Sequence, residues 1–246
     1  MSEDKAKLLP FYLVIDVSYS MDGENILAAN DIMPSLLEAL AQNPILSDKV
    51  RFCLIDFSDD AQVLLPLCDI LDPAMTVTGL AVRGGTSYAA AFRVLRKTIE
   101  NDVAQLKGDH YSVHRPAVFF LSDGETTDED HEWRAAFRDL TEYDRQTGTG
   151  FAMYPNFIPF GVAQADPSAL QQLIHPSTGS KQMRMFMMDK GNSPAEAIRA
   201  MAEILVSSVV NSGNVMAGGS SGIVLPDTTQ LPAGISSYGA DDDDFL

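Results

Sequence analysis

Short apolar runs alternate along the chain with longer segments in which apolar residues recur every three or four positions. The runs predict strands, and the segments with helical spacing predict helices between them. This alternation is typical of βαβ units that build a mostly parallel sheet. The expected strands are residues 11–16, 50–57, 117–121, 151–160 and 181–188. The expected helices are residues 23–41, 87–106, 167–174 and 194–210, with one more beginning at Thr127.

Two local features refine this pattern. Residues 61–67 follow the polar turn Ser58-Asp59-Asp60 and predict one short antiparallel edge strand. Pro34 lies within the helical segment 23–41 and should kink or divide it, because proline has no amide hydrogen to donate. We therefore expect an α/β, doubly wound, Rossmann-like fold with a mostly parallel sheet and one short antiparallel edge strand.

The composition changes after residue 210. Gly, Ser, Pro and Asp dominate the remaining segment, which contains no Lys or Arg. Such a composition buries too little apolar surface to order a chain by itself. We therefore expect a folded domain at 8–210 and a flexible acidic tail at 211–246.

The balance of charge narrows the choice of partners. The chain has 34 acidic and 17 basic residues, a formal net charge of -17. This charge argues against nucleic acid and against anionic membrane surfaces, both of which attract clusters of Lys and Arg. Neither an apolar run long enough to span a bilayer nor a signal-peptide pattern is visible, so we expect a cytoplasmic protein.

Three polar motifs follow predicted strands or precede predicted helices. They are Asp16-Val17-Ser18-Tyr19-Ser20, Arg83-Gly84-Gly85-Thr86-Ser87 and Ser122-Asp123-Gly124-Glu125. In an open α/β sheet, ligands bind at the carboxyl ends of the strands, where the strand order reverses. If the first strand neighbours the strand at 117–121, Asp16 and Asp123 face one crevice.

Carboxylates and hydroxyls are hard oxygen ligands, which favour Mg²⁺, Mn²⁺ or Ca²⁺ over zinc. Two carboxylates, Asp16 and Asp123, neutralise one divalent cation and no more. A cation held there with hydroxyls and water would still attract one further anionic oxygen. A carboxylate on a partner protein would supply that oxygen.

The ordered set of these motifs resembles the von Willebrand factor A (vWA) domain and its metal-ion-dependent adhesion site. The resemblance covers about residues 8–210. It implies that the metal ligands are Asp16, Ser18, Ser20, Thr86 and Asp123, with the threonine joining when a ligand is engaged. The family usually has glycine where this chain has Tyr19, so partner preference does not transfer from relatives.

The stretch LPFYLVIDVSYSM is similar to the bacterial TerY/YegL-like branch of the family. That resemblance implies a non-enzymatic scaffold or regulator in a chemical-stress or tellurite-resistance system. A protein kinase or phosphatase of the same system is then a candidate partner. No catalytic residue is assigned.

Other readings stay open. A Mg²⁺-dependent hydrolase could use Asp16 or Asp123 as base or nucleophile, although Arg83 is the only cation near the motifs. The oxygen cluster could also hold a metal that stabilises the fold and takes no part in partner binding. The tail ends in Asp241–Asp244 and Phe245-Leu246, a peptide that a basic groove could capture or that could offer its carboxylates to the metal site.

Overall fold

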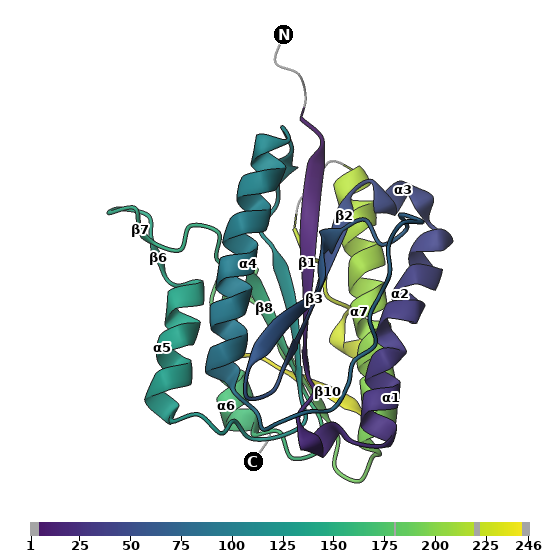
Figure 1. Cartoon of the computed structure of the whole chain (residues 1–246), viewed down its shortest axis with the longest axis vertical. Coiled ribbons are helices and arrows are strands. Elements are labelled where there is room, and N and C mark those ends of the chain that lie inside the picture. The colour runs from purple at the N-terminus through teal and green to yellow at the C-terminus, as the bar shows by residue number, and fades with distance from the viewer. Residues whose placement is uncertain (1–4, 180, 219–221, 243–246) are drawn as a thin grey trace.

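The computed structural model describes residues 5–179, 181–218 and 222–242 and is built around one twisted sheet (Figure 1). Its strands run in the order β10-β9-β8-β5-β1-β2-β3, with the short β4 (Ser112–Val113) paired to the start of β1. The long path consists of β10 (Ile235–Tyr238), β9 (Met185–Met188), β8 (Asn156–Gly161), β5 (Ala117–Ser122), β1 (Lys7–Asp16), β2 (Val50–Phe57) and β3 (Ala61–Cys68).

The sheet is mostly parallel, as predicted. Strands β1, β2, β5, β8 and β9 run in one direction, and β3 pairs antiparallel with β2 at one edge. Strand β10 pairs antiparallel with β9 at the other edge. The doubly wound α/β fold and the antiparallel edge strand at 61–67 are therefore confirmed, while the second antiparallel edge strand was not predicted.

Helices cover both faces of the sheet (Figure 1). One face is covered by α4 (Tyr88–Gly108) and α5 (Asp130–Thr141). The other is covered by α1 (Glu24–Asn30), α2 (Ile32–Ala41), α3 (Pro44–Ser47) and α7 (Pro194–Ala217). The smaller elements are η1 (Tyr19–Met21), α6 (Pro167–Gln171), η2 (Thr228–Gln230) and the hairpin β6 (Tyr143–Asp144) and β7 (Thr149–Gly150).

The helix predicted at 23–41 is divided into α1 and α2 at Asp31. Pro34 lies in the first turn of α2 and cannot donate to the carbonyl of Asn30, four residues earlier. The division therefore has the cause that the sequence indicated.

Aromatic side chains fill the space between the sheet and the α4–α5 layer. The ring of Phe120 on β5 stacks on Phe57 at 5.0 Å, meets Tyr88 edge-on at 5.0 Å and contacts Phe157 at 5.5 Å. All these rings are fully buried. Burying such a side chain contributes about 1.5–3 kcal/mol to folding, so this layer is a rigid support for the loops at the strand ends.

The predicted tail is partly structured, which corrects the expectation of a flexible segment from residue 211. Helix α7 continues to Ala217, seven residues past the predicted end, and β10 adds to the sheet. The helical signal was hidden because small polar residues occupy the buried face. The hydroxyls of Ser208 and Ser212 donate to the carbonyls of Ile204 and Ser208, and Gly213 packs against Leu46.

Other boundaries also differ from the prediction. Helix α5 begins at Asp130 rather than Thr127, because Thr127 bonds to the loop before α4 instead of capping its own helix. Strands β8 and β9 begin later than predicted, at Asn156 and Met185. These changes leave the order of elements intact.

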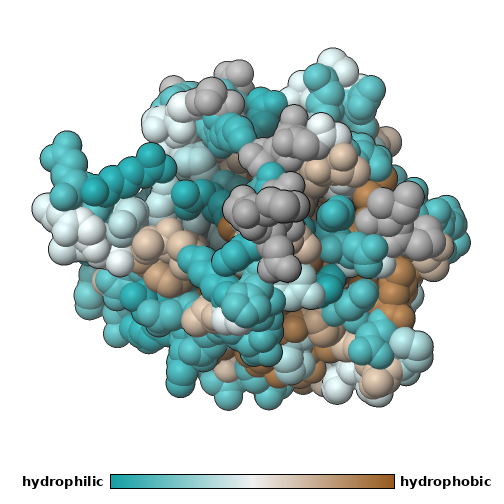
Figure 2. Space-filling view, turned by 90° about the horizontal axis from the view of Figure 1, so that it is seen from above, coloured by the Kyte–Doolittle hydropathy of each residue, from teal (hydrophilic) through white to brown (hydrophobic). Residues whose placement is uncertain are grey.

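The carboxyl ends of the parallel strands lie at the lower edge of the sheet in Figure 1 and carry the predicted polar motifs. Figure 2 shows the opposite end of the molecule, where hydrophilic residues cover most of the surface. Within the described ranges, no helix combines the length and the apolar character needed to cross a bilayer.

Candidate metal site at the ends of β1 and β5

Strands β1 and β5 are neighbours, and the strand order reverses between them. Strand β1 pairs with β2 on one side and with β5 on the other, with Ile15 opposite Leu121. This is the switch point at which α/β folds bind ligands. Asp16 and Asp123 stand at the two strand ends, and both are 0% exposed. The first strand and the strand at 117–122 are therefore neighbours, as a shared site for Asp16 and Asp123 requires.

A chain of hydrogen bonds joins four of the five predicted ligands. The Ser18 amide donates to Asp16 Oδ1 at 2.9 Å, and the Ser20 hydroxyl donates to Asp123 Oδ1 at 2.7 Å. The Ser18 and Ser20 hydroxyl oxygens are 2.9 Å apart. Since the Ser20 proton is directed at Asp123, Ser18 is the donor of that third bond. Both carboxylates and both serines thus meet in one cluster.

Thr86, the fifth predicted ligand, belongs to a loop that is tied to the other two. The Arg83 amide donates to the Val17 carbonyl at 2.7 Å, and the Tyr19 amide donates to the Gly84 carbonyl at 3.1 Å. The amide of Thr127 donates to the Thr86 carbonyl at 2.7 Å. Thr86 is 5% exposed, and among the described residues none bonds to its hydroxyl. The loop is held by its backbone, which leaves the hydroxyl free to bind a ligand.

The two glycines before Thr86 lie against the side chain of Asp59. Gly84 has a φ of 60°, and a Cβ there would lie 2.5 Å from a carboxylate oxygen of Asp59. A Cβ on Gly85 would lie 2.7 Å from the other oxygen of the same carboxylate. A side chain at Gly84 would be strained by its positive φ, and a side chain at either position would require the exposed Asp59 carboxylate to turn aside.

One oxygen of the cluster has no partner. Asp123 Oδ2 is buried and makes no hydrogen bond in the part of the chain that the structure describes. A buried carboxylate oxygen without a partner is unfavourable, so it marks a place where a cation or donor belongs. With two carboxylates and three hydroxyls on three loops, the donor chemistry fits a divalent cation. The residues present are therefore compatible with the predicted metal.

Burial raises the pKa of both carboxyl groups. The pKa of Asp16 rises to about 6, mainly because burial disfavours its charge, with hydrogen bonds from Ser18 and Ser122 acting in the opposite direction. Burial also raises the pKa of Asp123. The hydrogen bonds therefore do not fully replace the hydration that these carboxylates lose. A cation would favour the ionised form of each.

Ser122 and Tyr88 support Asp16 through contacts that were not predicted from the sequence. The Ser122 hydroxyl donates to Asp16 Oδ2 at 2.9 Å, and the Tyr88 hydroxyl lies 2.9 Å from Ser122 Oγ and 3.1 Å from the Gly124 carbonyl. Tyr88 belongs to the aromatic layer below the site, so it connects the rigid core to a metal-ligand candidate. Ser122 was visible as part of the motif before Asp123, whereas nothing local in the sequence distinguished Tyr88.

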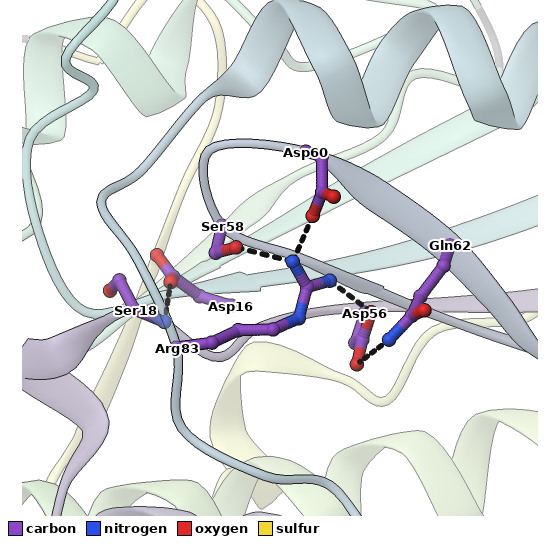
Figure 3. Close-up of polar contacts among 7 residues, drawn as sticks. All are labelled: Asp16, Ser18, Asp56, Ser58, Asp60, Gln62 and Arg83. Atoms are coloured by element: carbon purple, nitrogen blue, oxygen red, sulfur yellow. Dashed lines mark hydrogen bonds and ion pairs between the residues drawn. The ribbon is translucent and has the colours of Figure 1, made fainter.

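Arg83 forms a second polar cluster next to the first (Figure 3). Its guanidinium donates to Asp56 at 2.6 Å and to Ser58 at 2.5 Å, and it pairs with Asp60. Asp56 is 2% exposed and also accepts from Gln62 at 3.2 Å. The arginine that the sequence placed near the metal motifs is therefore engaged with carboxylates of the β2–β3 turn.

The described end of the tail contacts α6. Asp242 accepts a hydrogen bond from the Gly239 amide at 2.6 Å, and its carbonyl accepts one from Gln171 of α6 at 2.8 Å. Residues 243–246, which carry the rest of the acidic and hydrophobic peptide, lie outside the described residues. Capture of the tail by the metal site stays a prediction.

Comparison with known proteins agrees with this geometry. Residues 11–125 match the family model of the von Willebrand factor type A domain, a range that includes all five predicted ligands. This range of the chain therefore carries the sequence signature of a von Willebrand factor type A domain. A comparison with curated proteins found no significant match. The TerY/YegL-like resemblance is not tested by these findings.

Solved structures share the vWA fold at low sequence identity. A vWA protein from Catenulispora acidiphila has a TM-score of 0.57 and 15% identity over 82% of this chain and 43% of its own. The PilB minor pilin from Streptococcus sanguinis has a TM-score of 0.52 and 10% identity over 82% of this chain and 61% of its own. This chain thus spans only part of the length of each.

A third structure bears on the metal. Proximal thread matrix protein 1 from the mussel byssus, with a zinc-occupied adhesion motif, has a TM-score of 0.53 and 14% identity. The match covers 84% of this chain and 48% of that protein. Domains of this family commonly mediate metal-dependent protein–protein interactions. The choice of Mg²⁺ over other divalent cations for this chain is a proposal.

Proposed function

We propose that the vWA domain binds a partner protein through a divalent cation held by Asp16, Ser18, Ser20, Thr86 and Asp123. The observation that carries the proposal is the buried Asp123 Oδ2, which has no hydrogen-bond partner among the described residues, although Asp123 Oδ1 accepts from Ser20. A cation beside this oxygen would offset the cost of burying it, which supports a metal at this place.

Each residue has a separate task in this proposal. Asp16 and Asp123 supply the two negative charges, and the three hydroxyls supply neutral oxygens. Ser122 and Tyr88 hold Asp16 in place through their hydroxyls. A bound divalent cation, with Mg²⁺ as the first choice and Mn²⁺ or Ca²⁺ as alternatives, would offer a coordination position to a carboxylate of the partner.

We further propose a bacterial intracellular scaffold or regulator as the cellular role. The similarity of LPFYLVIDVSYSM to the TerY/YegL-like branch supports a chemical-stress or tellurite-resistance-like system. A protein kinase or phosphatase of that system would then be the partner, and no nucleic acid or membrane is involved.

The alternative of a Mg²⁺-dependent hydrolase is not favoured by the arrangement. Besides the metal ion, such an enzyme typically uses a lysine or arginine to stabilise the negative charge that develops in the transition state. Arg83, the cation near the motifs, is engaged by Asp56, Ser58 and Asp60. A binding role therefore accounts for more of the site than hydrolysis does.

The test is an affinity capture from native cell extract with Mg²⁺ or with EDTA. The bait is the full chain, the double variant Asp16→Ala/Ser18→Ala, or the matched control Asp48→Ala/Ser35→Ala, which alters exposed residues away from the site. We expect at least one protein that is retained only with Mg²⁺ and only by the wild type and the control. Thermal melting of each bait shows that it is folded.

Two results would contradict the proposal. A partner retained equally in EDTA and by the double variant would place the binding surface elsewhere. A wild-type melting temperature that does not respond to Mg²⁺, Mn²⁺, Ca²⁺ or Zn²⁺ would remove the metal itself, because a ligand that binds only the folded state must stabilise it.

A further inference from the structure

Exposed carboxylates surround the metal site on every loop that builds it. Asp22 follows the Ser20 ligand, Asp59 lies against the glycines before Thr86, and Glu125 follows Asp123 by two residues. All three are exposed, as are Glu24 and Asp60. The segments 16–25, 56–60, 81–87 and 122–129 together contain ten Asp or Glu residues and one basic residue, Arg83. We name these segments the rim.

The charge of the rim is not balanced from within. Arg83 is already paired with Asp56 and Asp60, and its side chain is 28% exposed. A divalent cation at the site would offset Asp16 and Asp123 and leave the exposed carboxylates uncompensated. Asp59 lies against the glycines before Thr86, and Asp22 and Glu125 are each two residues from a ligand candidate. Two residues span about 7 Å of extended chain, which is comparable to the screening length of about 8 Å in physiological salt, so salt weakens the effect of these charges without removing it.

The proposed ligand is itself an anion, so the negative charge of the rim restricts which carboxylates can approach the cation. A lone carboxylate approaching the cation would also approach Asp22, Asp59 and Glu125 and would be repelled by them. The repulsion becomes attraction when the carboxylate is accompanied by cations at the neighbouring positions. Complementary charge of this kind also raises the rate at which the two proteins meet. The net charge of -17 adds an attraction of the whole molecule for a basic partner.

Tyr19 also favours a ligand with basic neighbours. It lies between the ligand candidates Ser18 and Ser20, and its side chain is 73% exposed, the largest value among the large hydrophobic residues described as exposed. An aromatic ring attracts the ammonium of lysine and the guanidinium of arginine through its face. A residue next to the bridging carboxylate would meet this ring.

We infer that the partner presents an Asp or Glu carboxylate within a basic segment, with Lys or Arg on both sides of it. This inference rests on the proposed function, because it names the ligand of the same metal site. The independent observations are the unpartnered Asp123 Oδ2, which calls for a cation, and the exposed carboxylates and Tyr19, which select what accompanies the ligand.

Three labelled synthetic peptides test the inference with the full chain. The first has a central aspartate flanked by two lysines on each side, the second has serine flanks, and the third has lysine flanks around a central asparagine. Binding is measured by fluorescence anisotropy with Mg²⁺ and with EDTA. We expect the lysine-flanked aspartate peptide to bind about tenfold more tightly than the serine-flanked one, in Mg²⁺ only.

A rim variant shows where the preference arises. Asp22→Asn/Asp59→Asn/Glu125→Gln neutralises three exposed carboxylates that are not ligand candidates. The matched control, Asp48→Asn/Asp109→Asn/Glu203→Gln, makes the same charge change at exposed positions before β2, after α4 and on α7. The rim variant should bind the lysine- and serine-flanked aspartate peptides within about threefold of each other, whereas the control keeps most of the preference. Melting curves verify that both fold.

The outcomes separate this inference from the proposed function. Equal, Mg²⁺-dependent binding of both aspartate peptides overturns the inference and leaves metal-bridged binding intact. Equal binding of the aspartate and asparagine peptides, also in EDTA, overturns metal-bridged binding and shows attraction of charge alone. An absence of Mg²⁺-dependent binding to any peptide overturns both.

Discussion

Two buried aspartates at the ends of neighbouring strands are treated in opposite ways. Asp56 near the end of β2 is paired with the guanidinium of Arg83 at 2.6 Å and accepts from Gln62. Among the described residues, Asp16 at the end of β1 accepts only from neutral donors, Ser18 and Ser122, and its pKa is raised to about 6 by burial. The two clusters lie side by side in Figure 3.

The comparison separates stability from binding. A carboxylate with its own cation is complete and holds the β2–β3 turn against the loop that carries Thr86. A carboxylate pair without a cation is unfavourable in the metal-free protein and becomes favourable when a cation arrives. Arg83 is the counterion of Asp56 in the cluster that fixes the loops. Among the described residues, no side chain has this role for Asp16 and Asp123, which are proposed to bind the metal.

The largest effect on stability is expected from removing Arg83. The variant Arg83→Met leaves Asp56 buried and unpaired, which should lower the free energy of unfolding by about 3 kcal/mol. The double variant Arg83→Met/Asp56→Asn should recover more than half of that loss, because the unpaired charge is gone. Urea unfolding with Mg²⁺ absent measures both. Equal losses in the single and the double variant would show that packing, not charge, is the cause.

Replacing the other aspartate should have the opposite sign. In metal-free protein above pH 6, Asp16→Asn removes a buried charge and should raise the free energy of unfolding by about 1–2 kcal/mol. The same variant should lose the stabilisation by Mg²⁺, which for the wild type is about 2.7 kcal/mol at a hundredfold excess over Kd. A variant that is less stable than the wild type without metal would show that Asp16 is already compensated.

The pH dependence follows from the same pKa. Because the folded pKa of Asp16 is about 6 and the unfolded value is about 4, the folded state binds more protons between these values. Its contribution to stability therefore falls as the pH rises from about 4 to about 6. The difference in unfolding free energy between Asp16→Asn and the wild type should grow over this interval and then stay constant.

His175 also contributes to the pH dependence of stability, and its contribution must be distinguished from that of Asp16. Burial lowers its pKa to about 4, so its contribution to stability is lost as the pH falls from about 6.5 to about 4. Its sign is opposite to that of Asp16, and the two partly cancel in the wild type. Since His175 is present in both proteins, the difference between variant and wild type isolates Asp16. A difference that does not change between pH 4 and 6 would contradict the raised pKa.

A smaller effect is expected from Ser122, which hydrogen-bonds a ligand candidate. Ser122→Ala removes the donor to Asp16 Oδ2 and should weaken Mg²⁺ binding by about tenfold, a factor typical of losing a residue that holds a metal ligand in place. Isothermal titration calorimetry measures the affinity. Ser87→Ala is the matched control, since Ser87 caps α4 and bonds Asp128 rather than Asp16. Equal losses in the two variants would indicate general loosening of the loops.

The smallest effect is expected from Tyr19→Gly. The side chain is 73% exposed, so its removal should change the free energy of unfolding by less than about 1 kcal/mol and leave metal affinity nearly unchanged. Only binding of the lysine-flanked peptide should weaken, by about threefold. A large loss of metal affinity would show that Tyr19 orders the ligand loop instead.

Most of the fold was predictable because its signals are local. Apolar runs such as residues 117–121 indicate a sheet covered on both faces, and Pro34 indicated the divided helix. The end of α7 was not predictable, because serines that bond back to their own helix look like linker residues in a sequence. Strand β10 was missed for a related reason, since its partner β9 lies far away in the chain.

The sequence by itself determined which side-chain oxygens form the candidate metal site: two carboxylates and three hydroxyls, each at the end of a strand or the start of a helix, in an order typical of a vWA domain. These are local properties of residue type and spacing. Only the tertiary structure decided which carboxylate received a counterion, which oxygen was left without a partner, and that Tyr88 and Ser122 support Asp16. The physical reason is that burial and hydrogen bonding depend on residues brought together from distant parts of the chain, and these contacts set the energy of a charge.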